Sequence, residues 1–380
     1  MNAVKVGTRL FLGVSFALLM ALACQPGRAW ATSTVTAGST ETSAGAAPSV
    51  PRGKGLPIVV RTALSFASLN AFDDNKGSFE ATTDLRLSWH DASLRFPADT
   101  VSRGYKEYRG AAAEAELLRL WTPPVRFANR LGEPSLSERR LRVFPNGRIE
   151  VLARTTAVYK VAVDVAHFPF DRQSLKIDIV VREETSDAVD LDFTSDDVDF
   201  SRVANKAELD GWSLGLVNLQ RKTIKGWDGE NCASVSISLG VKRLAAGTIA
   251  TVFIPLFASL LIPFLATWMN KSRDGGFEVE AFELANVVIG GLFAVIALSF
   301  AISAAYPIVA SGDNTVTRLV GLNYVALATG LFIIVVFYRY GLPKRWFGPY
   351  VEEQAFRFLI WAFPFLFVCT GLAFVLLAAA

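Results

Sequence analysis

The chain has 380 residues, of which 52% are hydrophobic, and its formal net charge at pH 7 is only +3. This composition is too apolar for an ordinary soluble enzyme, and the apolar excess is concentrated after residue 244, as in a membrane protein. The small net charge gives no support for nucleic-acid binding, and two histidines with three scattered cysteines leave no credible metal cluster.

The first 56 residues are predicted to be a targeting segment followed by a leader. An apolar run, Leu10–Ala23, follows a basic start, and residues 29–31 match the small-x-small pattern of a signal peptidase site. We therefore predict a signal peptide over residues 1–31; the alternatives are an uncleaved anchor or a lipid attached to Cys24. Residues 32–56 are rich in Thr, Ser, Ala, Gly and Pro and are predicted to be a flexible leader.

Residues 57–243 are predicted to form an all-β, immunoglobulin-like sandwich. Short apolar runs alternate with turn signals, and only Glu107–Leu120 has the pattern of a helix. A module of this length can fill a single core. The predicted strands are Ile58–Leu69, Phe79–Trp89, Arg140–Phe144, Ile149–Ala153, Ala157–Val165, Leu175–Val181, Trp212–Leu219 and Ala233–Val241.

The most distinctive stretch is residues 161–175, which contain an apolar turn between two predicted strands. Pro169 lies between Phe168 and Phe170, and we call these three residues the aromatic turn. Because proline fixes φ and donates no hydrogen bond, the turn cannot continue a strand ladder and must present two aromatic rings elsewhere. With Asp171 beside it, the aromatic turn is predicted to dock onto another surface.

Four apolar segments follow, and each is long enough to cross a hydrocarbon core of about 30 Å as a helix. Basic residues are concentrated after the first and third segments, whereas the connection after the second carries only one arginine. By the positive-inside rule, the first and third connections are cytoplasmic and the sandwich lies outside. The all-α domain is predicted over residues 244–380, with spans at about 244–269, 283–306, 316–340 and 356–380.

The second span carries the functional argument. A 3.6-residue period places a carboxylate, an amide and then small and bulky apolar residues on one stripe of the helix. Copies of Glu283 around an axis would attract cations, and Phe293 could close a pore by dewetting. The alternative is that Glu283 only caps the helix and points at water. The stripe consists of Glu283, Asn286, Gly290, Phe293, Ala297 and Phe300 or Ala301.

The stretch 161–175 resembles the signature loop of the pentameric ligand-gated ion channels, the Cys-loop receptors. That family has the pattern Cys-x-x-Asp-Val-x-x-Phe-Pro-Phe-Asp-x-Gln-x-Cys. Val161 and Leu175 occupy the two cysteine positions, so the loop disulfide is absent, as in prokaryotic members. The matching residues are Asp164, Val165, Phe168, Pro169, Phe170, Asp171 and Gln173.

Other motifs carry the same resemblance. Residues 89–94 match Trp-x-Asp-x-x-Leu, and residues 121–129 are similar to Trp-x-Pro-Asp-x-x-x-Tyr-Asn. Residues 283–287 resemble the Glu-Ala-Asn-Val entry of a bacterial cation-selective pore helix, with one residue inserted. Because the insertion shifts the pore register by a residue or two, Glu278 and Glu280 are alternatives to Glu283.

The resemblance also implies where the two domains are coupled. In the family, the signature-loop aspartate, an acidic residue of the first hairpin loop and an arginine before the first span meet at the junction. The corresponding residues here are Asp171, Asp73 or Asp74, and Arg243. Such a group could repack during a small domain rotation, or could be an ordinary structural ion pair. The aromatic turn would then press on the loop Ile308–Thr317.

The agonist site is less clearly marked. The aromatic-cage positions of amine receptors fall on Asp84, Ala128 and Arg182, none of them aromatic, so an amine agonist is disfavoured. Arg182 resembles an arginine of proton-gated bacterial channels, and with Asp84 and Glu184 it could bind a carboxylate ligand or titrate. Trp227 is the aromatic candidate for a closing loop. Alternatively, these charges form a solvated interface.

These observations predict a homopentameric, cation-selective ligand-gated channel of a bacterial inner membrane, with protons or a small molecule acting on a periplasmic sandwich. The pentamer rests on the resemblance alone. The expected partners are the agonist, inorganic ions and the lipid bilayer, without nucleic acid, metal or cofactor. The alternative is a non-conducting, membrane-anchored ligand sensor. An enzyme is not predicted, because no nucleophile, base and orienting group share a recognisable spacing.

Overall fold

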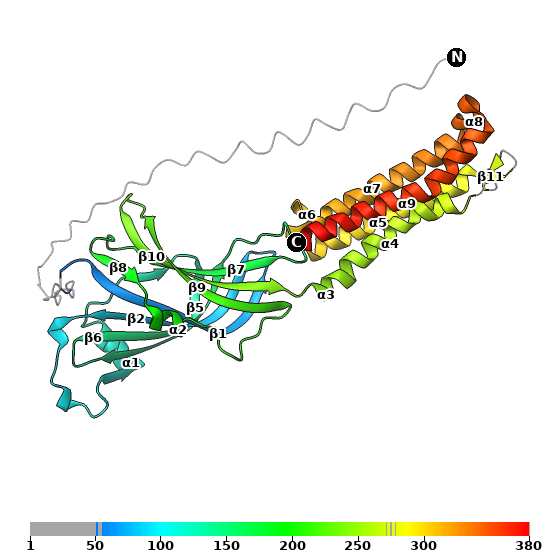
Figure 1. The fold of residues 1–380 in the computed structure, drawn as a ribbon. Coiled ribbons are helices and arrows are strands. Elements are labelled where there is room, and N and C mark those ends of the chain that lie inside the picture. The colour runs from blue at the N-terminus through cyan, green and yellow to red at the C-terminus, as the bar shows by residue number, and fades with distance from the viewer. Residues whose placement is uncertain (1–50, 52–54, 271, 274–275, 278, 380) are drawn as a thin grey trace, which may run out of the picture. The chain divides into compact units, whose positions relative to one another are not determined.

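A computed structural model of the chain describes residue 51 and residues 55–379, except 271, 274, 275 and 278. The predicted signal peptide and most of the predicted leader lie outside the described residues, as does Glu278. The described part consists of a β-sandwich followed by helices (Figure 1).

Two sheets form the sandwich, and all strand pairs are antiparallel except β1 with β8. The six-stranded sheet contains, in spatial order, β3 (Lys106–Arg109), β5 (Arg130–Val143), β6 (Arg148–Lys160), β2 (Ser78–His90), β1 (Ile58–Asp73) and β8 (Val189–Asp192). The four-stranded sheet contains β4 (Val125–Phe127), β7 (Arg172–Val181), β10 (Asn231–Arg243) and β9 (Trp212–Lys225). Short helices lie in the connections: η1 (Ala92–Leu94), η2 (Ala98–Thr100), α1 (Ala111–Leu117) and α2 (Ser195–Phe200).

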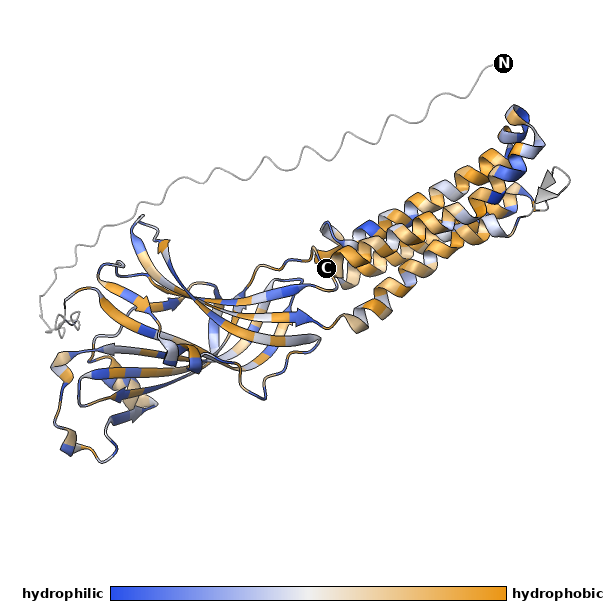
Figure 2. Ribbon diagram, viewed as in Figure 1, coloured by the Kyte–Doolittle hydropathy of each residue, from blue (hydrophilic) through white to orange (hydrophobic). Residues whose placement is uncertain are grey.

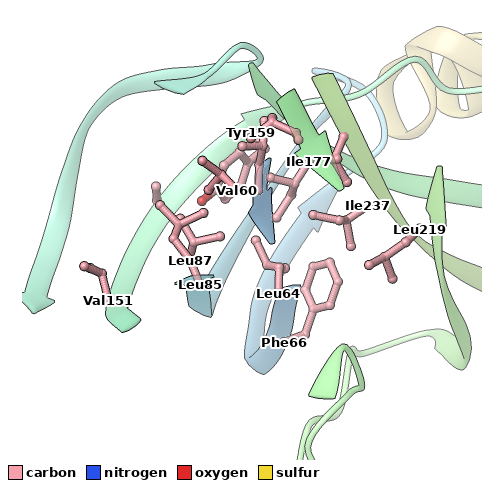
Figure 3. Packing of buried hydrophobic residues seen from close by; sticks show 14 of the residues in the cluster. Val60, Leu64, Phe66, Leu85, Leu87, Val151, Tyr159, Ile177, Leu219 and Ile237 are labelled. Atoms are coloured by element: carbon pink, nitrogen blue, oxygen red, sulfur yellow. The ribbon is translucent and has the colours of Figure 1, made fainter. Parts of the chain in front are cut away.

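The core of the sandwich follows from strict alternation in the sequence. Along β2, every second residue from Phe79 to Trp89 is buried, so one face of the strand points inward. Val60 and Leu64 of β1 meet Ile177 and Ile237 of the facing sheet in this core (Figure 3). The predicted sandwich is therefore confirmed.

Several predicted boundaries within the sandwich are wrong. β6 is one strand, although we predicted two, because its central polar residues have partners across the sheet. Arg154 forms a bidentate ion pair with Asp84 at 2.7 and 2.8 Å, and the hydroxyl groups of Thr156 and Thr82 lie 2.8 Å apart. The helix predicted over Glu107–Leu120 is strand β3 followed by the shorter α1. Strands β4 and β8 and helix α2 were not predicted.

Residues 161–165 do not form the strand that we predicted. The amide of Val161 donates to the carbonyl of Gly77. The side chain of Gln173 forms hydrogen bonds with the backbone of Asp164. Its Oε1 accepts from the Asp164 amide at 3.0 Å, and its Nε2 donates to the Asp164 carbonyl at 2.5 Å. A side chain therefore replaces the ladder bonds that a neighbouring strand would supply.

Among the described residues, the helical domain has four helical spans that are long and apolar enough to cross a membrane: Ala245–Trp268, Ala281–Ala305, Thr315–Arg339 and Pro349–Ala379. Hydrophobic residues dominate these spans, whereas the sandwich strands are mixed (Figure 2). The component elements are α3 (Ala245–Thr248), η3 (Ile249–Phe253), α4 (Ile254–Trp268), β11 (Ser272–Arg273), β12 (Gly276–Phe277), α5 (Ala281–Ala305), α6 (Pro307–Ser311), α7 (Thr315–Ile333), η4 (Ile334–Arg339), α8 (Leu342–Phe347) and α9 (Pro349–Ala379).

Helix α4 packs against α5, α7 and α9. The first span contains a π-helical turn, η3, just before Pro255. Because proline has no N–H, the regular hydrogen bond to the preceding turn is lost, and a wider turn accommodates the change. The aromatic residues of the fourth span divide between two environments: Phe363 and Phe367 are buried in the bundle, whereas Phe358 and Trp361 are exposed.

Candidate functional site

Arg243 is the centre of a buried ion-pair group formed by three distant segments. It ends β10, Asp171 follows the aromatic turn, and Asp74 lies in the turn between β1 and β2. The Nε of Arg243 donates to Oδ1 of Asp171 at 2.7 Å, and its Nη2 donates to Oδ2 of Asp74 at 2.7 Å and to Oδ2 of Asp171 at 3.2 Å. We call Arg243, Asp171 and Asp74 the junction triad.

The structure distinguishes between the two aspartates that the sequence left as alternatives. Asp74 contacts Arg243, whereas Asp73 forms an exposed ion pair with the ammonium of Lys76 at 2.9 Å. Of the two alternatives, Asp74 is the partner of Arg243, and the inclusion of Asp73 among the coupling residues is wrong. The tight turn directs the side chains of consecutive residues differently, so only one of them reaches the arginine.

The surroundings of Arg243 keep it charged. Burial by itself lowers the pKa of the guanidinium, but the hydrogen bonds and charges of Asp171 and Asp74 outweigh burial, and the net pKa is raised above its ordinary value. Its guanidinium carbon also lies 4.2 Å from the ring centroid of Trp212 and 5.0 Å from that of Phe168. A cation held by two carboxylates and two aromatic faces is strongly localised.

Two residues of this group had no predicted role. Gln173 donates from Nε2 to Oδ2 of Asp171 at 2.7 Å, so it holds the carboxylate that accepts from Arg243. Its place in the signature pattern was the signal for such a role. Trp212 begins β9, and nothing in its local sequence indicates that it would lie against Arg243, since the contact depends on pairing between β9 and β10.

The aromatic turn joins the sandwich to the helices. The Phe168 side chain is fully buried, and its ring centroid lies 5.7 Å from that of Tyr306 at the end of α5. The hydrophobic cluster around Phe168 also contains Val252, Phe253, Leu256, Ile302, Val309, Val316 and Leu319. Val309 lies in α6, between the second and third spans, and Val316 lies in the first turn of α7. Both fall within Ile308–Thr317, where we expected the turn to press. Pro169 is buried as well, whereas Phe170 is only half-buried.

The predicted stripe on α5 lies on the face that packs against none of the described residues of this chain. Glu283, Asn286, Gly290, Phe293, Ala297 and Phe300 are all exposed, with exposed fractions of 67% for Phe293 and 72% for Phe300. The buried residues Leu284, Val288, Gly291, Val295 and Ile302 form the opposite face. Exposure is what both the pore and the helix-cap interpretations of Glu283 require. Glu280, its described alternative, is also exposed.

The two adjacent glycines of α5 show how sharply its faces differ. A Cβ atom at Gly291 would lie 2.7 Å from a side-chain carbon of Ile262 in α4, so only glycine permits this close approach. A Cβ atom at Gly290 would meet no atom within 4 Å. Gly290 therefore lies on a free face, and Gly291 lies at a tight helix contact.

The predicted ligand residues are not brought together within one chain. The Asp84 carboxylate is already paired with Arg154 in the six-stranded sheet. Arg182 and Glu184 follow the end of β7, and Trp227, with an exposed fraction of 94%, lies between β9 and β10. Within the part of the chain that the structure describes, no hydrogen bond or ion pair links these four side chains. Among the same residues there is also no cluster of three His, Cys, Asp or Glu suited to a metal.

Comparison with known proteins identifies the family. A sequence model described as the neurotransmitter-gated ion-channel ligand binding domain matches residues 47–245, which is more than half of the chain. The chain belongs to the pentameric ligand-gated ion channel family. The matched range covers the whole sandwich and ends just after the arginine of the junction triad.

Individual members of the channel family are similar to the chain at low identity. The proton-gated ion channel of Gloeobacter violaceus is 25% identical over 220 residues, which are 57% of each protein. The glycine receptor subunit beta of Homo sapiens is 21% identical over 242 residues, 59% of this chain and 45% of the receptor subunit. The gamma-aminobutyric acid receptor subunit pi of Bos taurus is 26% identical over 133 residues, 34% of this chain and 28% of the receptor subunit. The chain thus spans less than two thirds of the length of these relatives.

A buried carboxylate in this channel-family sandwich has a definite pH dependence. Asp197 of α2 accepts a hydrogen bond from the Arg86 guanidinium at 2.8 Å and from the Thr194 amide at 2.9 Å. Burial alone raises the pKa of Asp197, but these hydrogen bonds outweigh burial and hold the net pKa below its ordinary value. Because the folded pKa is depressed, the stabilisation is present above the unfolded pKa of about 4 and is lost as pH falls through the folded value.

We expect Asp197→Asn to lower the free energy of unfolding at neutral pH by about 1.5–3 kcal/mol, because charged hydrogen bonds are lost. The difference between unaltered protein and variant should persist down to about pH 4 and shrink below it. Denaturant titration of the full chain in detergent at several pH values measures both effects. Asp196→Asn is the control, since that neighbouring side chain is exposed. An equal loss in both variants would contradict the assignment.

Proposed function

We propose that this chain is one subunit of a homopentameric, cation-selective ligand-gated channel in a bacterial inner membrane, with the sandwich on the periplasmic side. Family membership supports a channel, and the four apolar helices support a multi-pass membrane protein. The observation that carries the proposal is the free face of α5. A helix that could cross a membrane leaves a carboxylate, an amide and two phenylalanines unpacked on one side.

Ion selection is assigned to Glu283 in the first turn of α5. In a pentamer with the free face toward the axis, five carboxylates would line one end of the pore, attract cations and repel anions. Further along the same face, Phe293 and Phe300 are bulky and apolar, and a ring of such side chains can exclude water and close the pore. The start of α5 would select ions, and its middle would gate them.

Coupling is assigned to the junction triad and the aromatic turn. The triad links the β1–β2 turn, the signature loop and the end of β10, which leads directly into the first span. Phe168 reaches the end of α5 and the connection that follows it. Movement of the sandwich would therefore shift the outer end of the pore helix through tightly packed contacts, which transmit small displacements.

The proposed agonist is either the proton or a small molecule with a carboxylate. The relative from Gloeobacter violaceus is named a proton-gated ion channel, which makes protons the first agonist to test. Asp197 is not the expected sensor, because its depressed pKa keeps it charged until the pH falls below about 4. Arg182 and Glu184, which follow the end of β7, are better candidates for the site at which the agonist acts.

Current through planar bilayers containing the purified full chain tests this proposal. We expect cation current to appear when the pH is stepped from about 7 to about 4 on the side of the bilayer that carries the sandwich. Exposed carboxylates and histidines titrate in this range. Current that appears only with a small carboxylate would keep the channel and replace the proton. No current under either condition would reject the channel in favour of a non-conducting sensor, which a predicted pore stripe poor in hydroxyl groups would permit.

We expect Glu283→Ala to lower the cation-to-anion permeability ratio by about fivefold or more, because one charge contact in water is worth about 1 kcal/mol. Reversal potentials in a salt gradient measure the ratio. Glu353→Ala is the matched control, since Glu353 pairs with Arg357 on the exposed side of α9. If the ratio is unchanged in Glu283→Ala and falls in Glu280→Ala, the selectivity ring belongs to Glu280.

A further inference from the structure

Strands β9 and β10 change their register once, between Leu239 and Val241 of β10. At that point two residues of β9, Gly215 and Leu216, stand opposite the single residue Gly240. Such an arrangement is a β-bulge: the extra residue interrupts the ladder of hydrogen bonds and bends the strand. The bulge lies three residues before Arg243, the centre of the junction triad.

The bulge decides which side chain of β9 reaches the junction triad. On its far side from the triad, Leu239 lies opposite Val217. If that register continued to the end of β10, Arg243 would lie opposite Ser213. With the extra residue, Arg243 lies opposite Trp212 instead, and the Trp212 ring centroid is 4.2 Å from the guanidinium carbon. Because the side chains of a strand alternate between its two faces, a shift of one residue turns Trp212 from one face of β9 to the other.

The two facing glycines of the bulge are not equivalent. A Cβ atom at Gly215 would lie 2.9 Å from the carbonyl oxygen of Gly240, so the two backbones are too close for another residue unless one of them moves. For a Cβ atom at Gly240, the nearest described atom would be the carbonyl oxygen of Leu216, at 4.0 Å. The close approach therefore requires glycine at position 215 and tolerates a larger residue at position 240.

Protection of a sheet edge is the alternative explanation of the bulge. Strand β9 is the last strand of its sheet, and bulges hinder such edges from pairing with other chains. Edge protection, however, is indifferent to which residue faces Arg243. Trp212 is buried, and its ring centroid also lies 5.0 Å from that of Phe72 in β1, whereas Ser213 is exposed. Loss of the bulge would therefore exchange a packed aromatic ring for a small polar side chain.

We propose that Gly215 is a positioning residue of the coupling group. By permitting the bulge, it places Trp212 against the Arg243 guanidinium, where the face of the ring stabilises the cation. Gly215 contributes to coupling through that ring, and this part of the inference rests on the coupling role proposed for the junction triad. The placement of Trp212 is independent of that role and can be measured by itself.

A disulfide between β9 and β10 reports the register directly. Ser213 and Lys242 lie opposite each other and are both exposed, so cysteines at these two positions can form a disulfide. In the other register, position 213 would lie on the opposite face from position 242, and the disulfide would not form. We expect the full chain in detergent with Ser213→Cys and Lys242→Cys to form this disulfide, as identified by peptide mass mapping. Adding Gly215→Ala should abolish it, whereas adding Gly240→Ala should leave it intact.

Deletion of Leu216 provides a rescue. With one residue removed from the bulge, a regular ladder keeps Trp212 opposite Arg243 and does not need the close approach at Gly215. Adding the deletion to Gly215→Ala should therefore restore the disulfide. In bilayers, Gly215→Ala alone should require a stronger stimulus to open the channel, and the deletion should return the activation curve toward that of the unaltered chain.

Equal disulfide formation with and without Gly215→Ala would overturn the proposal. Failure of the deletion to restore the disulfide would also overturn it and would assign the bulge to edge protection; this comparison holds even if Gly215→Ala alone does not fold. An unaltered activation curve in a Gly215→Ala chain that has lost the disulfide would reject the role in coupling. Absence of current from the unaltered chain would contradict the proposed channel instead, because the disulfide measurement needs no current.

Discussion

Replacing Arg243 by glutamine is expected to lower the free energy of unfolding by about 3–5 kcal/mol, because removing one partner of a buried ion pair leaves uncompensated charge. Arg243 has an exposed fraction of 9%, and its partners Asp171 and Asp74 have side-chain exposed fractions of 2% and 17%. Without the guanidinium, the hydrogen bond from Gln173 is the one that the described side chains would still give the Asp171 carboxylate. Denaturant titration of the full chain, followed by tryptophan fluorescence, measures the loss.

The matched control is Arg318→Gln. Arg318 also forms a bidentate pair, with Asp313 at 2.9 and 3.0 Å, but the two side chains have exposed fractions of 50% and 76%. Because water screens an exposed pair, the expected loss is much smaller than that of Arg243→Gln. Similar losses in both variants would show that burial does not strengthen the junction triad.

A second substitution separates the ion pair from simple packing. If the cost of Arg243→Gln arises from an unpaired buried charge, adding Asp171→Asn should restore part of the lost stability, since the remaining group is then neutral. If the cost arises from lost packing of Arg243 on Trp212, the double variant should be no more stable than the single one. We expect partial recovery of stability without recovery of agonist-evoked current, because the link to Asp74 is still absent.

Replacing Phe168 by alanine is expected to destabilise the protein by about 3–5 kcal/mol, the usual cost of removing a buried phenylalanine. The ring is fully buried in the cluster with Val252, Phe253 and Ile302, and it lies against Tyr306 and the Arg243 guanidinium. Surrounding side chains from the sandwich and from three spans cannot all move to fill the space. The same denaturation experiment measures the loss.

The functional effect of Phe168→Ala should exceed its effect on folding. If the aromatic turn transmits movement to α5, the remaining folded channels should need a stronger stimulus to open, visible as a shift of the current-activation curve. Phe170→Ala is the internal control, since that neighbouring ring is only half-buried. A folded Phe168→Ala variant with unaltered activation would show that the turn only anchors the two domains.

Local patterns were sufficient for much of the fold. Alternation along Phe79–Trp89 indicates a strand with one buried face, because the side chains of a strand point to alternate faces. Long apolar runs indicate helices that can cross a membrane, because their length matches the hydrocarbon core. The stripe from Glu283 to Phe300 was predicted from the same period, and the structure leaves that face unpacked. Its role in a pore remains a prediction that current measurements decide.

Local patterns failed where long-range pairing decides the structure. The polar middle of β6 looked like a break, but Asp84 and Thr82 on β2 supply its partners. Residues 161–165 alternate as a strand does, yet the Gln173 side chain forms both backbone hydrogen bonds of Asp164. In β6, polar side chains are satisfied by residues of β2 that are far away in the sequence. At Asp164, a side chain satisfies the backbone groups that a neighbouring strand would otherwise pair with.

The sequence by itself determined the division into a sandwich and four apolar spans, and through the spacing of residues 161–175 it determined the family to which the chain belongs. Only the tertiary structure decided that Asp74 rather than Asp73 meets Arg243, and that Trp212 lies beneath the guanidinium. The physical reason is that periodicity reports which side of an element is buried, whereas the partner of a buried charge depends on segments that approach one another only in the folded chain.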